Sequence, residues 1–148
     1  MTKSDVSPLT VYAPAPLAEG RPGAPLYETA ISAGFPSPAE DYVQEELDLH
    51  KLLVRNPPAT FFLRVSGDSM LGAGIHNGDL LVVDRSQDAV SGKIVIAAWE
   101  GELTVKRLRV RDKRVFLCPD NPAYPEFDIT DSENAVIWGV VTYVVHKV

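Results

Sequence analysis

The chain has 148 residues, 45% of them hydrophobic, which is enough for one packed domain and an additional segment. Its 14 basic residues against 20 acidic ones give a net charge of −6, which argues against a general nucleic-acid-binding protein. The single cysteine, Cys118, excludes an intrachain disulfide and favours a reducing compartment. Because no apolar stretch approaches the roughly 20 residues of a membrane span, and the first residues lack the apolar core of a signal peptide, we expect a soluble, cytoplasmic protein.

Residues 1–40 differ in composition from the rest of the chain. They contain seven of its twelve prolines: Pro8, Pro14, Pro16, Pro22, Pro25, Pro36 and Pro38. Because proline lacks a backbone donor and interrupts regular helices, we predict a flexible or extended arm over 1–40, in which only 26–31 would order on docking. The arm contains Ala33-Gly34, a peptide bond between two small residues and therefore a candidate cleavage site.

Two short helices are expected next. The segment 39–47 follows a proline and is acidic at its start, which favours a helix. Asp48 is a candidate N-cap for a second helix, whose apolar positions are Leu49, Leu52 and Leu53. The sequence Asn56-Pro57-Pro58 would end this helix.

Beyond residue 59 the pattern changes to short β-branched runs separated by turn residues such as Asn77-Gly78, Ser91-Gly92 and Glu100-Gly101. The runs predict strands at 60–66, 79–84, 93–99, 102–109, 114–118 and 135–145. Six strands in fewer than 90 residues indicate a mainly β domain, which we place at 41–148, rather than alternating βαβ units.

Ser69 and Lys106 are the candidate catalytic pair. Ser69 lies in a glycine-containing turn after a predicted strand, where its hydroxyl could project above a sheet. A serine hydroxyl is a poor nucleophile until a base takes its proton, and a lysine can be that base only if burial keeps it neutral. The alternatives are a serine that only forms a turn and a lysine that is solvated.

The apolar pattern around Lys106 changes phase. Leu103 and Val105 share one face of the predicted strand, whereas Lys106 shares the other face with Leu108 and Val110. Either a bulge occurs near Lys106 or both faces of the strand are partly covered. In both cases Lys106 can point inward, which would lower the pKa of its amine.

These residues resemble a known family. The matching motifs are Ala33-Gly34-Phe35-Pro36-Ser37-Pro38, Gly67-Asp68-Ser69-Met70, Gly74-Ile75-His76-Asn77-Gly78-Asp79, Leu103-Thr104-Val105-Lys106 and Trp138-Gly139-Val140-Val141. Over about three quarters of its length the chain is similar to UmuD, to the plasmid-borne relatives of UmuD, and to the C-terminal domain of LexA-type repressors. The resemblance implies a LexA/signal-peptidase-like β fold and self-cleavage.

The resemblance also implies a role for each site residue. Ser69 would attack the Ala33 carbonyl, Lys106 would take the serine proton, and Gly34 would supply the leaving amine. The backbone amides of Asp68 and Ser69 would stabilise the oxyanion. Neither a cofactor nor a metal is expected.

Partners follow from the same resemblance. Cleavage would be stimulated by a RecA–single-stranded-DNA filament, and the shortened chain would dimerise and join a Y-family DNA polymerase subunit (UmuC-like) for error-prone translesion synthesis in the SOS response. The first 40 residues hold no pair of amphipathic helices, so we expect no direct sequence-specific DNA binding.

Other interpretations remain at this point. The chain could be a binding module in which cleavage is incidental, or a peptidase that acts on other proteins. His50, His76 and His146 show no ligand spacing, so we expect hydrogen-bonded or solvated side chains, with a pairing of His76 and Ser69 as an alternative. The basic residues between 107 and 114 are expected to be solvated, or to contact DNA phosphates or an acidic partner.

Overall fold

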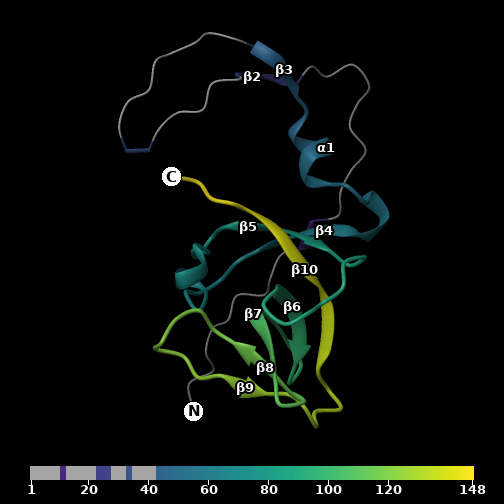
Figure 1. Cartoon of the computed structure of the whole chain (residues 1–148), viewed down its shortest axis with the longest axis vertical. Helices are drawn as coiled ribbons and strands as arrows, with labels where there is room; N and C mark the ends of the chain where they lie inside the picture. Colours follow the sequence, from purple (N-terminus) through teal and green to yellow (C-terminus); the bar gives the residue numbers. More distant parts are fainter. Residues whose placement is uncertain (1–10, 13–22, 28–32, 35–42) are drawn as a thin grey trace. The chain divides into compact units, whose positions relative to one another are not determined.

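The computed structural model describes residues 11–12, 23–27, 33–34 and 43–148. They divide into two compact units, one from the range 15–55 and one from the ranges 1–14 and 56–148. The second unit is built around a large antiparallel sheet, and the first holds a pair of strands and one helix (Figure 1). In the described part of the chain, no helix is long and apolar enough to cross a membrane.

The large sheet has eight strands in the order β1-β4-β5-β10-β6-β7-β8-β9. The strands are β1 (Val11–Tyr12), β4 (Thr60–Arg64), β5 (Leu80–Asp84), β6 (Ile94–Trp99), β7 (Glu102–Arg111), β8 (Arg114–Cys118), β9 (Phe127–Asp128) and β10 (Val136–Val145). Every neighbouring pair is antiparallel. Two short 3-10 helices, Pro57–Ala59 and Leu71–Ala73, complete this unit.

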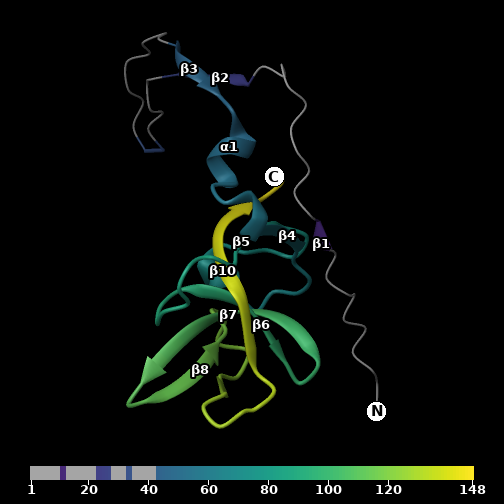
Figure 2. The same ribbon diagram turned by 90° about the vertical axis from the view of Figure 1, so that its right-hand side faces the viewer.

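Strand β10 joins the two halves of the sheet. The first part of β10 pairs with β6 and its second part pairs with β5, and the register shifts once against each neighbour. Such irregularities bend a strand. Figures 1 and 2 show β10 in yellow, running from the β6–β9 half to the β4–β5 half. The two halves can therefore enclose apolar side chains between them.

The core has two clusters of buried side chains. One contains Leu63, Val65, Met70, Ile75, Leu81, Val83 and Ile96, and the other contains Val95, Ala97, Leu108, Leu117, Ile129 and Val140. Ile96 of β6 belongs to the first cluster and its neighbour Val95 to the second, as expected from the alternation of side chains along a strand. Strand β6 thus separates the clusters, and the first of them supports the region of Ser69.

The smaller unit contains β2 (Ala24–Tyr27), β3 (Val43–Leu47) and helix α1 (Leu49–Leu53). Strands β2 and β3 pair antiparallel. The Asp48 side chain accepts a hydrogen bond from the Lys51 amide at 3.1 Å, so the predicted N-cap is confirmed.

Most predicted elements are confirmed, and one is wrong. The six strands occur within a few residues of their predicted ends, and the mainly β fold class is correct. The helix predicted at 39–47 is contradicted at Val43–Leu47, which form β3. Residues 24–27 fall in the predicted arm but form β2, which pairs with Val43–Leu47, and tertiary pairing overrides a weak local preference. The positions 39–42 and most of 26–31 lie outside the described residues, and the flexible arm over 1–40 stays a prediction.

Candidate active site

Ser69 lies in a turn that follows β4, and Met70 anchors this turn in the core. Met70 is 1% exposed and belongs to the first core cluster. Gly67 has a φ of +97°, a left-handed conformation that favours glycine. The Gly67 amide donates a hydrogen bond to the Asn77 side chain at 2.8 Å. The turn is thereby connected to the segment that leads into β5.

The segment after β8 holds the other side of the turn. The Asn121 side chain donates to the Asp68 carbonyl at 2.9 Å, and the Tyr124 hydroxyl donates to the Asp68 carboxylate. Further along, the Gly72 amide donates to the Asp120 carbonyl at 2.7 Å. A Cβ at Gly72 would lie 2.6 Å from that carbonyl oxygen, so only glycine allows this approach. The backbone around Ser69 is therefore held before any substrate arrives.

Lys106 points into the molecule from β7. The strand keeps a regular register against both neighbours, with Lys106 opposite Val95 and Arg107 opposite Cys118. The bulge considered from the sequence is therefore absent from β7, and partial covering of both faces accounts for the apolar pattern. Lys106 is 8% exposed.

The Lys106 amine has three polar neighbours and no carboxylate partner among the described residues. Its Nζ lies 3.1 Å from Ser69 Oγ, 2.7 Å from Thr104 Oγ1 and 3.1 Å from the Val105 carbonyl oxygen. Burial lowers the pKa of Lys106 below its ordinary value of 10.5. Since no negative charge opposes this effect, the neutral amine becomes accessible nearer to physiological pH.

A neutral amine fits these three neighbours. It has two N–H donors, which Thr104 Oγ1 and the Val105 carbonyl can accept, and one lone pair directed to the Ser69 hydroxyl. In this arrangement the serine donates its proton to the amine, as a nucleophile does to its base. Thr104 was not singled out from the sequence, although it lies two positions before Lys106 and so shares its face of the strand.

Two backbone amides belong to the turn that carries the hydroxyl. Within the described part of the chain, the amides of Asp68 and Ser69 donate no hydrogen bond to protein. Amides without an acceptor at a nucleophile are candidates for an oxyanion hole. This arrangement supports the role expected for them, which stays a prediction.

The pair opens onto a cleft of about 320 Å³. Its walls are mostly apolar and include Leu63, Leu81, Ile96, Leu103, Val105 and Phe127. Such a cleft can accept a short peptide with small or aliphatic side chains. It draws its walls from both halves of the sheet.

The expected cleavage site, Ala33-Gly34, belongs to the smaller unit. Both residues are exposed and form a bend.

Several basic residues of β7 and β8 form ion pairs with carboxylates. Arg107 forms a bidentate pair with Asp120, and the Nη2–Oδ2 distance is 2.6 Å. Arg111 pairs with Glu126, and Arg114 with Asp128. These carboxylates compete with DNA phosphates for the arginine side chains. The ion pairs therefore disfavour the alternative that the basic residues contact DNA.

Two histidines that are 70 positions apart in the sequence lie together in the structure. The rings of His76 and His146 lie with centroids 4.6 Å apart, and both approach Asp79. The expected hydrogen-bonded state is confirmed for His146, whose Nδ1 lies 2.6 Å from Asp79 Oδ1. His76 contacts these two residues, and no contact with Ser69 occurs.

Comparison with known proteins gives the family. The model of the Peptidase S24-like family matches residues 25–142. Protein SamA of Salmonella typhimurium is 52% identical over 124 residues, which cover 84% of this chain and 86% of SamA. Protein MucA of Escherichia coli is 54% identical over 80% of this chain and 82% of MucA. The LexA repressor of Frankia alni is 38% identical over 97% of this chain and 56% of the repressor. The chain therefore belongs to the Peptidase S24-like family, in agreement with the resemblance to UmuD and LexA-type proteins.

Proposed function

We propose that the chain is a UmuD-like SOS mutagenesis protein that cuts its own Ala33–Gly34 bond with Ser69 and Lys106. The observation that carries the proposal is the 3.1 Å approach of Lys106 Nζ to Ser69 Oγ, with the amine buried and without a carboxylate partner among the described residues. Membership of the Peptidase S24-like family supports the same chemistry.

The reaction proceeds in two stages. Lys106 takes the Ser69 proton while Oγ attacks the Ala33 carbonyl carbon, and the amides of Asp68 and Ser69 bind the resulting oxyanion. When the carbon–nitrogen bond breaks, the proton passes from Lys106 to the Gly34 amine, which leaves. Lys106 then takes a proton from water, the hydroxide attacks the ester between Ala33 and Ser69, and the proton passes to Ser69 Oγ as the Ala33 carboxylate is released.

The cleft suits the proposed substrate segment. Its apolar walls can accept the Ala33 methyl group and the Ile31 side chain, while Gly34 presents no side chain to the leaving side. Ile31 lies outside the described residues. Recognition of the self-segment therefore depends on small and aliphatic groups rather than on charge.

Control and partners complete the proposal. A RecA–single-stranded-DNA filament stimulates the cut, and the shortened chain forms a homodimer that joins a Y-family polymerase for translesion synthesis. Similarity to SamA and MucA over more than four fifths of their length supports a role of this kind. Among the described residues, the helices are α1 and two 3-10 turns, so no helix-turn-helix is present there to read an operator.

Mass spectrometry of the purified full chain tests the cut. After incubation at alkaline pH without a partner, two fragments are expected, 1–33 and 34–148, because high pH populates the neutral amine. Ser69→Ala and Lys106→Ala should leave the chain intact. Matched controls, Ser132→Ala and Lys93→Ala, should be cut at the wild-type rate. Intact wild-type protein, or a cut at another bond, would overturn the assignment.

A mutagenesis assay in cells separates self-cleavage from a simple binding role. Ser69→Ala should lose damage-induced mutagenesis, and a chain expressed directly as 34–148 should restore it. If Ser69→Ala supports mutagenesis as well as the wild type, cleavage is incidental and the chain acts as a binding module.

A further inference from the structure

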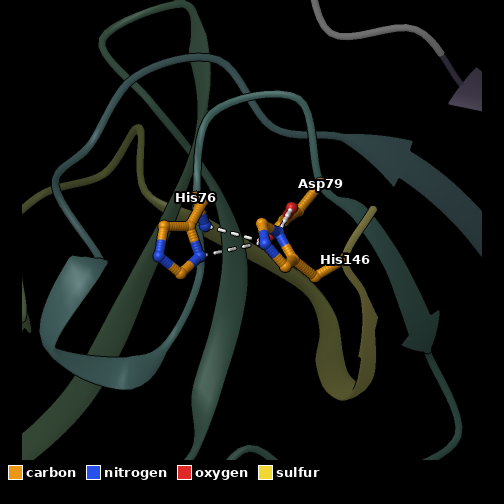
Figure 3. A group of neighbouring side chains, drawn as sticks. All are labelled: His76, Asp79 and His146. Atoms are coloured by element: carbon orange, nitrogen blue, oxygen red, sulfur yellow. Dashed lines mark hydrogen bonds and ion pairs between the residues drawn. The ribbon is translucent and has the colours of Figure 1, made fainter. Parts of the chain in front are cut away.

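A second group of reactive side chains lies at the start of β5. His76, Asp79 and His146 each offer one ligand atom, and these atoms all lie within 4.8 Å of one another. Figure 3 shows the two imidazoles and the carboxylate gathered at one place, the first histidine and Asp79 from the turn before β5 and the second histidine from the end of the chain. The proposed peptidase chemistry uses none of these three residues.

The fold itself brings the three residues together. His76 and Asp79 close one turn, in which the Asp79 amide donates to the His76 carbonyl at 3.1 Å. Strand β10 pairs antiparallel with β5, and Val145 lies opposite Leu80. The residue that follows β10 is His146, and the residue before Leu80 is Asp79, so the pairing places them side by side. The meeting is therefore fixed by backbone register rather than by chance contact of long side chains.

The geometry suits a transition-metal ion. His146 Nδ1 lies 2.6 Å from Asp79 Oδ1, and His76 Nδ1 lies 3.6 Å from Asp79 Oδ2. Ligands of a tetrahedral zinc ion, with bonds near 2.0–2.1 Å, lie about 3.4 Å apart, so shifts of about 1 Å or less would be needed for these pairs. Two imidazoles and one carboxylate form a common ligand set for such ions.

The surroundings also favour a metal site. Asp79 is 3% exposed, and the His76 backbone amide donates to its Oδ2 at 2.7 Å, which orients the carboxylate as outer partners orient metal ligands. The two histidine side chains are 49% and 44% exposed. The buried carboxylate gives a rigid base, while the half-exposed rings leave access for an ion and for water as a fourth ligand.

We propose that His76, Asp79 and His146 form a binding site for one divalent transition-metal ion, of which Zn²⁺ is the representative. The ion would connect the end of β10 to the turn that precedes β5. The same turn carries Asn77, whose side chain accepts a hydrogen bond from Gly67 in the Ser69 turn. The bound ion would thus stabilise the chain terminus against the segment that supports the nucleophile.

Calorimetric titration of the full, untagged chain with Zn²⁺ after removal of metals tests the site. One ion per chain is expected, and Zn²⁺ should raise the melting temperature. The double variant His76→Gln/His146→Gln should bind at least about 100-fold more weakly, since two of three protein ligands are lost. The matched control His50→Gln should bind as the wild type does.

Two further measurements check that the variants are folded and that the ion is not bound by a thiolate. Circular dichroism without metal shows whether the double variant is folded; if it is not, the single His146→Gln variant at the chain end takes its place. Co²⁺ should give an absorption spectrum without a thiolate charge-transfer band. No binding of Zn²⁺, equal binding by the double variant, or a thiolate band from Cys118 would overturn the proposal; loss confined to the His76 and His146 variants supports it.

Discussion

The charge state of Lys106 depends on its burial and its uncharged neighbours more than on the ordinary pKa of a lysine amine. The residue is 8% exposed, and its amine meets two hydroxyls and a carbonyl, all of which are uncharged. The adjacent Arg107 is the opposite case, because the Asp120 hydrogen bonds raise the pKa of its guanidinium. Neighbouring positions on one strand thus keep one cation permanently charged and let the other lose its proton, as the alternation of faces permits.

The lowered pKa of Lys106 predicts how self-cleavage depends on pH. At pH values below that pKa, the neutral fraction of the amine, and with it the initial rate, should rise about tenfold per pH unit. The rate should reach a plateau before the ordinary lysine value of 10.5, because burial displaces the pKa downward. Initial rates measured from the amount of 34–148 across this range would show the profile.

The control for this profile is Lys106→Arg. A guanidinium stays charged throughout the range, so the variant should be inactive at every pH rather than merely shifted. A wild-type rate independent of pH, or an Arg variant that cuts, would contradict the role of Lys106 as the base.

At the scale of elements, strands with an apolar run between turn residues could be predicted, and strands that lack such a run could not. Strand β8 occurs with its predicted bounds, since Val115, Phe116 and Leu117 form an apolar run between turns. Strand β9 has only two residues, too few to show any alternation. Strand β2 contains Pro25, which favours an arm in the sequence, although proline is tolerated in an edge strand.

One ion pair connects β7 to the segment that holds the Ser69 turn. Arg107 and Asp120 are 23% and 21% exposed, and the pair is bidentate. Asp120→Asn should lower the free energy of unfolding by about 1–2 kcal/mol, the range of a partly buried, charge-assisted hydrogen bond. Chemical denaturation at neutral pH measures this loss.

The pH dependence of this loss of stability gives a second test of the Asp120→Asn variant. The Arg107 hydrogen bonds hold the pKa of Asp120 below its ordinary 3.8, so the carboxylate's contribution is complete above 3.8 and is lost as the pH falls through the folded-state pKa. The difference between wild type and Asp120→Asn should therefore shrink in acid. The matched control Glu126→Gln removes the more exposed pair with Arg111 and should change stability little. An equal effect of both variants would refute the argument.

At the scale of the molecule, the candidate residues could be predicted but their meeting could not. Ser69 and Lys106 were found from motif and spacing, whereas their 3.1 Å approach depends on the way β10 joins the two halves of the sheet. His76 and His146 show no ligand spacing in the sequence, since 70 positions separate them. Only the register of β10 against β5 shows that they are neighbours.

Strand β1 protects one edge of β4, and cleavage would remove this protection. It pairs with β4 at the end of the sheet and lies before the proposed cleavage bond, so release of 1–33 would leave β4 as an edge strand. Backbone amides at Phe62 and Leu63, the positions opposite β1, should then exchange with solvent about fivefold faster in 34–148 than in the intact Ser69→Ala chain, the factor that a hydrogen bond of about 1 kcal/mol provides. Hydrogen-exchange mass spectrometry can compare the two. Peptides from β8, whose partners lie within 34–148, serve as the control, and identical exchange in β4 would show that β1 does not protect that edge.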